Sequence, residues 1–99
     1  MFTIEYAEGV AEDLAAMRPF DRSQLLDRME EQLTQQPTTL TRNKKILAGL
    51  TPPWEHEPPV WELRVGEFRV FYDVDETQQR VTVRAVWRKR PHDTTEEIL

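Results

Sequence analysis

Residues 60–88 alternate between apolar and polar side chains in three successive runs, and this pattern constrains the fold more than any other feature of the sequence. Alternation with a period of two predicts β-strands that bury one face. A two-residue turn at Gly66-Glu67 joins the first two runs, and a longer polar connection at residues 75–80 joins the second to the third. We therefore expect a sheet whose apolar face is covered by the rest of the chain.

The alternation divides these residues between two faces. The apolar face, expected to be core, holds Trp61, Leu63, Val65, Phe68, Val70, Tyr72, Val74, Val81, Val83, Ala85 and Trp87. The opposite face holds Glu62, Arg64, Arg69, Phe71, Asp73, Thr82, Arg84, Val86 and Arg88. The same register sets Arg64 opposite Arg69, and like charges opposite each other destabilise a sheet. Because the fold gains nothing from this pair, it suggests a site for an anionic ligand.

The first 37 residues predict one strand and two helices. Residues 2–6 alternate like a short strand, and residues 8–17 carry apolar side chains at helical spacing. Asp21 and Gln24 have the spacing of a capping box, so a second helix is expected from there to Pro37. The order β-α-α-β-β-β predicts a single α+β domain, residues 1–99, in which a two-helix hairpin packs on an antiparallel four-stranded sheet.

Composition excludes several classes of protein. The chain has no cysteine, so a disulfide framework and thiolate metal sites are excluded, and a reducing compartment is expected. The sequence shows no secretory pattern and no long apolar run, from which we expect a cytoplasmic protein that does not contact membranes. His56 between two glutamates is a poor zinc site, because adjacent side chains point apart. We expect no metal and no cofactor.

The net charge of −5 argues against nucleic acid as a partner, but the charge is unevenly distributed. Residues 1–37 hold eight acids and three bases, whereas residues 38–99 hold ten of each. Residues 80–90 contain five bases and no acid. A local basic surface is therefore expected on a molecule with acidic helices.

Residues 61–76 (WELRVGEFRVFYDVDE) and 81–86 (VTVRAV) resemble the RelE/ParE superfamily of type II toxins. The run TRNKKIL at 41–47 and residues 6–14 are also similar to that superfamily, so the likeness covers nearly the whole chain. The resemblance implies two helices on a curved antiparallel sheet, and a cognate antitoxin protein that neutralises the toxin. It also implies cleavage of mRNA in the ribosomal A site, whereas ParE-like relatives poison DNA gyrase.

The resemblance also assigns roles to individual residues. Arg69 falls at the central arginine of the family, which binds the scissile phosphate, and Arg64 on the same face supports it. Lys89, or Arg90 beside it, falls near the arginine that follows the last strand. The chain departs from well-studied RelE nucleases by having Val60 and Glu62 where they carry lysines, and by having no aromatic residue after Trp87.

In place of the C-terminal tyrosine of the family, the resemblance implies His92 or Glu62 as the proton-transfer group. An exposed His92 without a role, and a Glu62 that only pairs with Arg64 or Arg69, are the alternative interpretations. Contacts to the RNA backbone are expected from Arg42, Lys44, Lys45, Arg88 and Arg90. For the cluster at 42–45, a solvated loop is an equally good interpretation. Trp54 either stacks on a base or packs over the sheet edge.

Two functions remain open at this point. The first is a RelE-like, metal-independent endoribonuclease that acts on ribosome-bound mRNA and inhibits translation. The second is a protein of the same fold without nuclease activity, either a gyrase inhibitor or a degenerate toxin that only binds its antitoxin.

Overall fold

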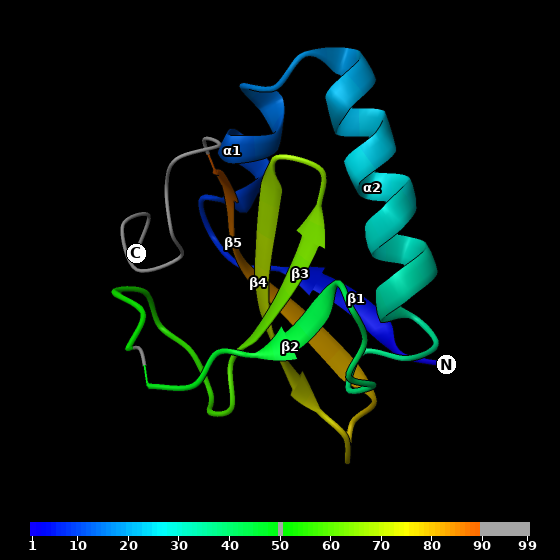
Figure 1. The fold of residues 1–99 in the computed structure, drawn as a ribbon, viewed down its shortest axis with the longest axis vertical. Helices are drawn as coiled ribbons and strands as arrows, with labels where there is room; N and C mark the ends of the chain where they lie inside the picture. Colours follow the sequence, from blue (N-terminus) through cyan, green and yellow to red (C-terminus); the bar gives the residue numbers. More distant parts are fainter. Residues whose placement is uncertain (50, 90–99) are drawn as a thin grey trace.

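The computed structural model describes residues 1–49 and 51–89. Its elements are β1 (Thr3–Tyr6), α1 (Val10–Ala15), α2 (Pro19–Leu33), β2 (Lys44–Ile46), β3 (Trp61–Val65), β4 (Phe68–Asp75) and β5 (Arg80–Arg88). The strands form one sheet in the order β1-β5-β4-β3-β2, and both helices pack against one face of it (Figure 1). Within the described ranges, no helix has the length and apolar character needed to cross a bilayer.

The α+β class agrees with the sequence prediction, but two details of the sheet differ. Residues Lys44–Ile46 form a fifth strand that pairs antiparallel with β3, and three residues are too few to produce a recognisable alternation. Strand β1 pairs with β5 in parallel, so the sheet is mixed and not purely antiparallel. An alternating pattern is the same in either direction, and for this reason it carries no information about strand orientation.

Helix α2 begins at Pro19, two residues before the predicted capping box. Proline suits the first turn of a helix, because its φ is already helical and its missing N–H has no partner to lose there. Arg18 is the extended N-cap residue, and no side chain caps the helix. Asp21 instead accepts a hydrogen bond from Arg18 Nε at 3.2 Å, so the predicted capping box is wrong.

The main core lies between the helices and the sheet. It contains the buried residues Val10, Leu14, Leu25, Met29, Leu33, Trp61, Leu63, Val70, Tyr72, Val81, Val83 and Val86. Trp61 and Tyr72 stack in it with an interplanar angle of 18°. The Tyr72 hydroxyl donates to the Pro37 carbonyl at 2.6 Å, which ties the segment after α2 to the sheet.

A β-bulge interrupts the pairing of β4 with β5. Phe71 is opposite Ala85 and Tyr72 is opposite Val83, so Arg84 is an extra residue in β5. A bulge of this kind shifts the phase of every following side chain by one position. The face assignment made from simple alternation therefore fails beyond Arg84.

Four predicted positions change face as a result. Val86 joins the core under the helices, and Arg88 pairs with Phe68 on that same side. Ala85 packs instead with Phe71 in a second apolar cluster on the opposite face, and Trp87 packs against it. The sequence prediction placed all four of Ala85, Val86, Trp87 and Arg88 on the wrong face.

Candidate functional site

The tight hairpin between β3 and β4 brings two arginines together as predicted. Val65 pairs with Phe68, which leaves Gly66-Glu67 as the turn, and Arg64 pairs with Arg69. Gly66 adopts a positive φ of 57°, a conformation that glycine takes without steric cost. The turn therefore fixes the register that sets the two guanidinium groups on one face.

Arg69 is buried, a property that alternation alone does not predict. The residue is 6% exposed, and its Nη1 donates to the carbonyls of Gly66 and Phe68 at 2.9 Å each. Its Nε is also buried but finds no hydrogen-bond acceptor. A buried donor without an acceptor costs about 1–3 kcal/mol, so this atom is a candidate contact for a ligand oxygen.

The electrostatics of the pair also favour an anion. Burial, and then the charge of Arg64, lower the pKa of the Arg69 guanidinium, while Glu62 acts in the opposite direction. Arginine stays charged despite such a shift in pKa, because the guanidinium group is a very strong base. Arg64 is exposed. An anion beside both groups would relieve their mutual repulsion and the cost of burying Arg69.

Glu62, one of the two candidates for proton transfer, lies next to this pair. It is 3% exposed, and its Oε1 is 3.8 Å from Arg69 Nε. Its neighbours across the sheet are Lys45 and Phe71. The structure thus groups Glu62, Arg64 and Arg69 on one face, in two adjacent strands.

The other predicted site residues are distributed differently. Lys89 is partly buried, and its backbone N–H donates to the Glu67 carbonyl at 2.6 Å beside the hairpin turn. Arg88 is exposed and pairs with the Glu67 carboxylate at 2.7 Å, on the helix side of the sheet. Arg90 and His92 lie outside the described residues.

Lys44 is a structural residue in this fold. It is 1% exposed, and its ammonium donates to the carbonyls of Gln36 at 2.6 Å and Gln32 at 3.4 Å. It thereby satisfies carbonyls at the C-terminal end of α2 and just beyond it, where a positive charge is favoured. Because Lys44 is buried on the helix side, only Arg42 and Lys45 of this basic run are exposed.

A second apolar cluster covers the sheet on the side of Arg69. It contains Leu47, Val60, Phe71 and Ala85, with Trp54 and Trp87 packed against them. Trp54 comes from the proline-rich segment between β2 and β3. It packs on Phe71 of β4 and Trp87 of β5, which are interior strands, and not over the sheet edge as predicted. The sequence signal for this cluster was Phe71, an apolar residue between Arg69 and Asp73 on a face that was predicted to be mostly charged.

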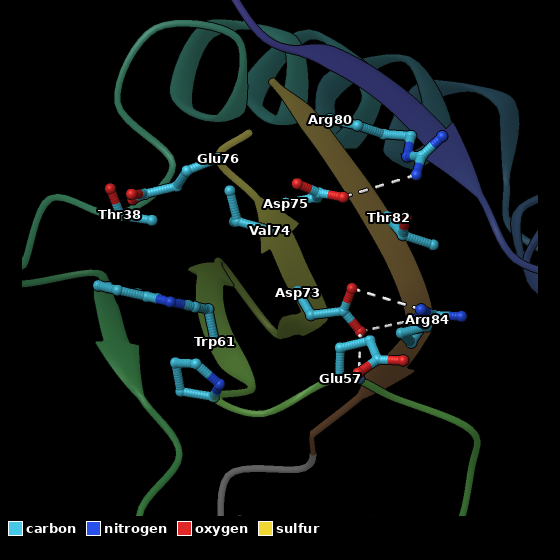
Figure 2. Close-up of a pocket in the computed structure, with 11 residues that line it drawn as sticks. Thr38, Glu57, Trp61, Asp73, Val74, Asp75, Glu76, Arg80, Thr82 and Arg84 are labelled. Atoms are coloured by element: carbon cyan, nitrogen blue, oxygen red, sulfur yellow. Dashed lines mark hydrogen bonds and ion pairs between the residues drawn. The ribbon is translucent and has the colours of Figure 1, made fainter. Parts of the chain in front are cut away.

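A hollow of about 760 Å³ lies at the other end of this face, where β4 ends and β5 begins, and Figure 2 shows the residues that line it. Asp73 accepts hydrogen bonds there from Arg84 Nε at 2.7 Å and from the Glu57 backbone at 3.0 Å. Arg84 and Asp73 thus form an ion pair at this end of the sheet. Arg80 contacts Asp75 at 3.8 Å. Arg80 and Arg84 each have a carboxylate partner, and so does Arg69 in Glu62, whereas Arg64 has none among the described residues. We therefore place the candidate site at the pair of Arg64 and Arg69.

The fold has well-defined relatives among solved structures. It resembles RelE in a RelE-RelB complex from Pyrococcus horikoshii OT3 with a TM-score of 0.70 and 16% identity, covering 93% of this chain and 98% of that one. It resembles the isolated E. coli RelE toxin with a TM-score of 0.70 and 17% identity, covering 99% and 95%. A toxin-antitoxin complex, RelBE2 of Mycobacterium tuberculosis, gives 0.69 and 19%, covering 89% and 98%.

These likenesses define the class of protein, an α+β domain with the RelE fold. The family follows from the sequence. Residues 4–91 match the model of the ParE toxin of the type II toxin-antitoxin system parDE, and the chain therefore belongs to this family of toxins. No curated protein is significantly similar to it in sequence.

Proposed function

We propose that this toxin is a RelE-like endoribonuclease that cleaves ribosome-bound mRNA and thereby inhibits translation. The observation that carries the proposal is the cross-strand pair Arg64 and Arg69, together with the buried Arg69 Nε that lacks an acceptor. A phosphate oxygen is the acceptor that this atom lacks. Arginine is also the side chain best suited to hold phosphate through two parallel hydrogen bonds.

In the proposed reaction, a base removes the proton of a ribose 2′-hydroxyl, and the 2′-oxygen attacks the adjacent phosphorus. The bond from phosphorus to the 5′-oxygen of the next nucleotide breaks, and that oxygen takes up a proton. Arg69 and Arg64 stabilise the additional negative charge on the phosphate in the transition state. Glu62 or His92 transfers the protons. This chemistry needs no metal ion.

The burial of Arg69 suggests an order of events. Exposed Arg64 meets the phosphate first, and Arg69 engages it after a small movement of the side chains that cover its Nε. Lys89, beside the hairpin turn, and exposed Lys45 add positive charge for the neighbouring phosphates. Arg42 is exposed, and exposed Arg88 lies on the opposite side of the sheet from Arg69. These two charges would assist the approach of the RNA.

We also propose that a cognate antitoxin protein binds this chain and blocks its activity in the cytoplasm. The support is that RelE proteins of the same fold were solved as complexes with RelB, including the intact E. coli RelBE toxin-antitoxin complex. A short reading frame beside this gene, encoding a protein that copurifies with the toxin, would support the proposal. A toxin that stands alone in its genome would argue against it.

A second function is favoured by the family match. The matching model describes ParE toxins, and the sequence resemblance associates ParE-like members with poisoning of DNA gyrase. The glutamate at position 62 and the net charge of −5 are consistent with a binding protein that lacks nuclease activity.

Inducible expression with primer-extension mapping of transcripts distinguishes the two functions. For the nuclease, we expect cuts in phase with codons that disappear in Arg64→Ala, an exposed position whose loss leaves the core intact. Arg69→Lys tests the bidentate contact without removing the charge. Arg80→Ala, a surface arginine away from the pair, is the matched control and should cleave normally. Growth arrest with intact mRNA and an induced DNA-damage response would refute the nuclease and support the gyrase inhibitor.

A further inference from the structure

Three aromatic rings lie next to the arginine pair on the same face of the sheet. The Trp54 ring centroid is 5.1 Å from that of Phe71 and 5.2 Å from that of Trp87. Trp87 is the cross-strand partner of Arg69 in the β4–β5 pairing. Phe71 is fully buried beneath the two tryptophans, whereas both indoles are partly exposed. Partly exposed aromatic rings thus border the proposed phosphate site.

The rings of this group meet at angles that leave their faces unstacked. Trp54 is tilted by 45° to Phe71 and by 78° to Trp87. In the main core, by contrast, Trp61 and Tyr72 lie nearly parallel at 18°. Among the described residues, neither ring contact of Trp54 is therefore a face-to-face stack. An unstacked indole face is what a nucleobase requires.

Trp54 is also held in place by its own segment. Its carbonyl is hydrogen-bonded to His56 Nδ1 at 2.9 Å. Glu57, which follows His56, donates its backbone N–H to the Asp73 carboxylate at 3.0 Å. Two anchors close to the indole reduce the entropy that a ligand must remove on binding.

Apolar packing alone does not account for a tryptophan at this position. Trp54 Nε1 is buried without a hydrogen-bond partner, which costs about 1–3 kcal/mol. A phenylalanine would fill apolar space over Phe71 without burying a donor. The larger indole with its higher cost is explained if its π face has a ligand.

Charge determines which part of a nucleotide can occupy this position. Glu55 and Glu57 follow Trp54 in the chain and are exposed, so a phosphate over the indole would be repelled. The phosphate is attracted instead to Arg64 and Arg69. A nucleotide on this face therefore directs its backbone to the arginines and its base to Trp54.

We propose that Trp54, supported by Phe71 and Trp87, is the stacking surface for a base of single-stranded RNA, adjacent to the phosphate at the arginine pair. This inference rests on the proposed nuclease function and adds a residue that selects an unpaired, accessible base. Stacking is tolerant of base identity. The subsite thus recognises a splayed base without reading its sequence.

The test measures the affinity of toxin variants for ribosomes programmed with an mRNA fragment, and changes the protein and the RNA in turn. The A-site codon of the fragment carries 2′-deoxyribose, so that the toxin binds it without cleaving it. Loss of base stacking costs about 1–3 kcal/mol, or about 5- to 150-fold in affinity. We expect Trp54→Ala to lose this factor with the intact fragment. A second fragment lacks the base at the stacked position. With this abasic fragment, Trp54→Ala should weaken binding by less than about twofold. Trp54→Phe, which keeps a smaller ring, should lose less affinity than Trp54→Ala, and Phe20→Ala, an aromatic residue 71% exposed on α2, is the matched control.

The outcomes separate the inference from the function on which it rests. If Arg64→Ala and Arg69→Lys weaken binding but Trp54→Ala does not, the stacking surface is refuted and the phosphate site stands. Stacking would also be refuted if Trp54→Ala weakened binding equally with the intact fragment and with every abasic fragment, since Trp54 would then have a purely structural role. If the wild-type protein does not bind programmed ribosomes, or if neither arginine matters, the nuclease proposal fails and the inference fails with it.

Discussion

Tyr72 offers the sharpest test of how the fold is held together. Its side chain is fully buried in the core, and its hydroxyl donates at 2.6 Å to the carbonyl of Pro37, which is also fully buried. Tyr72→Phe keeps the ring and removes only the oxygen. The carbonyl then loses its donor in a place that water does not reach.

The expected magnitude follows from these contacts. Leaving a buried acceptor unsatisfied costs about 1–3 kcal/mol. For a domain of this size, each kcal/mol lowers the melting temperature by about 4–8 °C. We therefore expect Tyr72→Phe to melt at least about 4 °C below the wild type at pH 7.

The same hydroxyl makes the stability depend on alkaline pH. Burial raises the pKa of Tyr72 above its ordinary value, so its contribution is complete below pH 10 and is lost as the pH rises further. In that range the unfolded chain releases the proton and the folded chain retains it. At pH 11 the loss reaches about 1.4 kcal/mol, given an unfolded pKa of about 10. The stability gap between wild type and Tyr72→Phe should therefore narrow between pH 9 and pH 11.

Urea unfolding followed by circular dichroism at pH 7, 9, 10 and 11 measures both effects. Tyr6→Phe is the matched control, because Tyr6 is 44% exposed and lies on the edge strand β1; it should change the stability by less than about 0.5 kcal/mol at pH 7. A variant Tyr72→Phe as stable as the wild type at pH 7 would refute the role of the hydrogen bond. A gap that does not change with pH would refute the buried, protonated state.

Three further predictions concern single contacts. Lys44→Met should lower the free energy of unfolding by about 1–2 kcal/mol, because two carbonyls near the end of α2 lose their donor; Lys45→Met, at an exposed position, should change it by less than about 0.5 kcal/mol in the same urea titration. Asp73→Asn should cost about 2–4 kcal/mol in thermal melts by leaving a largely buried guanidinium without its countercharge, whereas the exposed Asp75→Asn should cost under about 1 kcal/mol. Gly66→Ala meets no steric clash but should cost about 1–2 kcal/mol for its positive φ, and Gly66→Asn should cost less; equal melting temperatures for the two would contradict this.

Much of the fold could be predicted from local pattern. The alternation of β3 and β4 gave the correct faces, and the turn at Gly66-Glu67 gave the correct register. The pairing of Arg64 with Arg69 followed directly, since a two-residue turn leaves no freedom in the positions opposite each other. These features depend on residues close together in the sequence.

The errors arose where a contact between distant segments overrode the local pattern. The bulge at Arg84 is accompanied by an ion pair between Arg84 and Asp73, eleven residues earlier. A strictly alternating pattern cannot predict an inserted residue. Likewise, the burial of Lys44 depends on the carbonyls that α2 brings to it. Neither arrangement leaves a periodic signal in the chain.

The sequence by itself determined that this protein is an α+β toxin with two arginines opposed on one sheet face, because spacing and turn length decide which side chains share a face. Only the tertiary structure decided that Arg69 is buried with an unsatisfied Nε and that Trp54 and Trp87 border it. Burial depends on which segments fold across a strand, and Trp54 reaches Phe71 and Trp87 from a segment that is distant from them in the sequence.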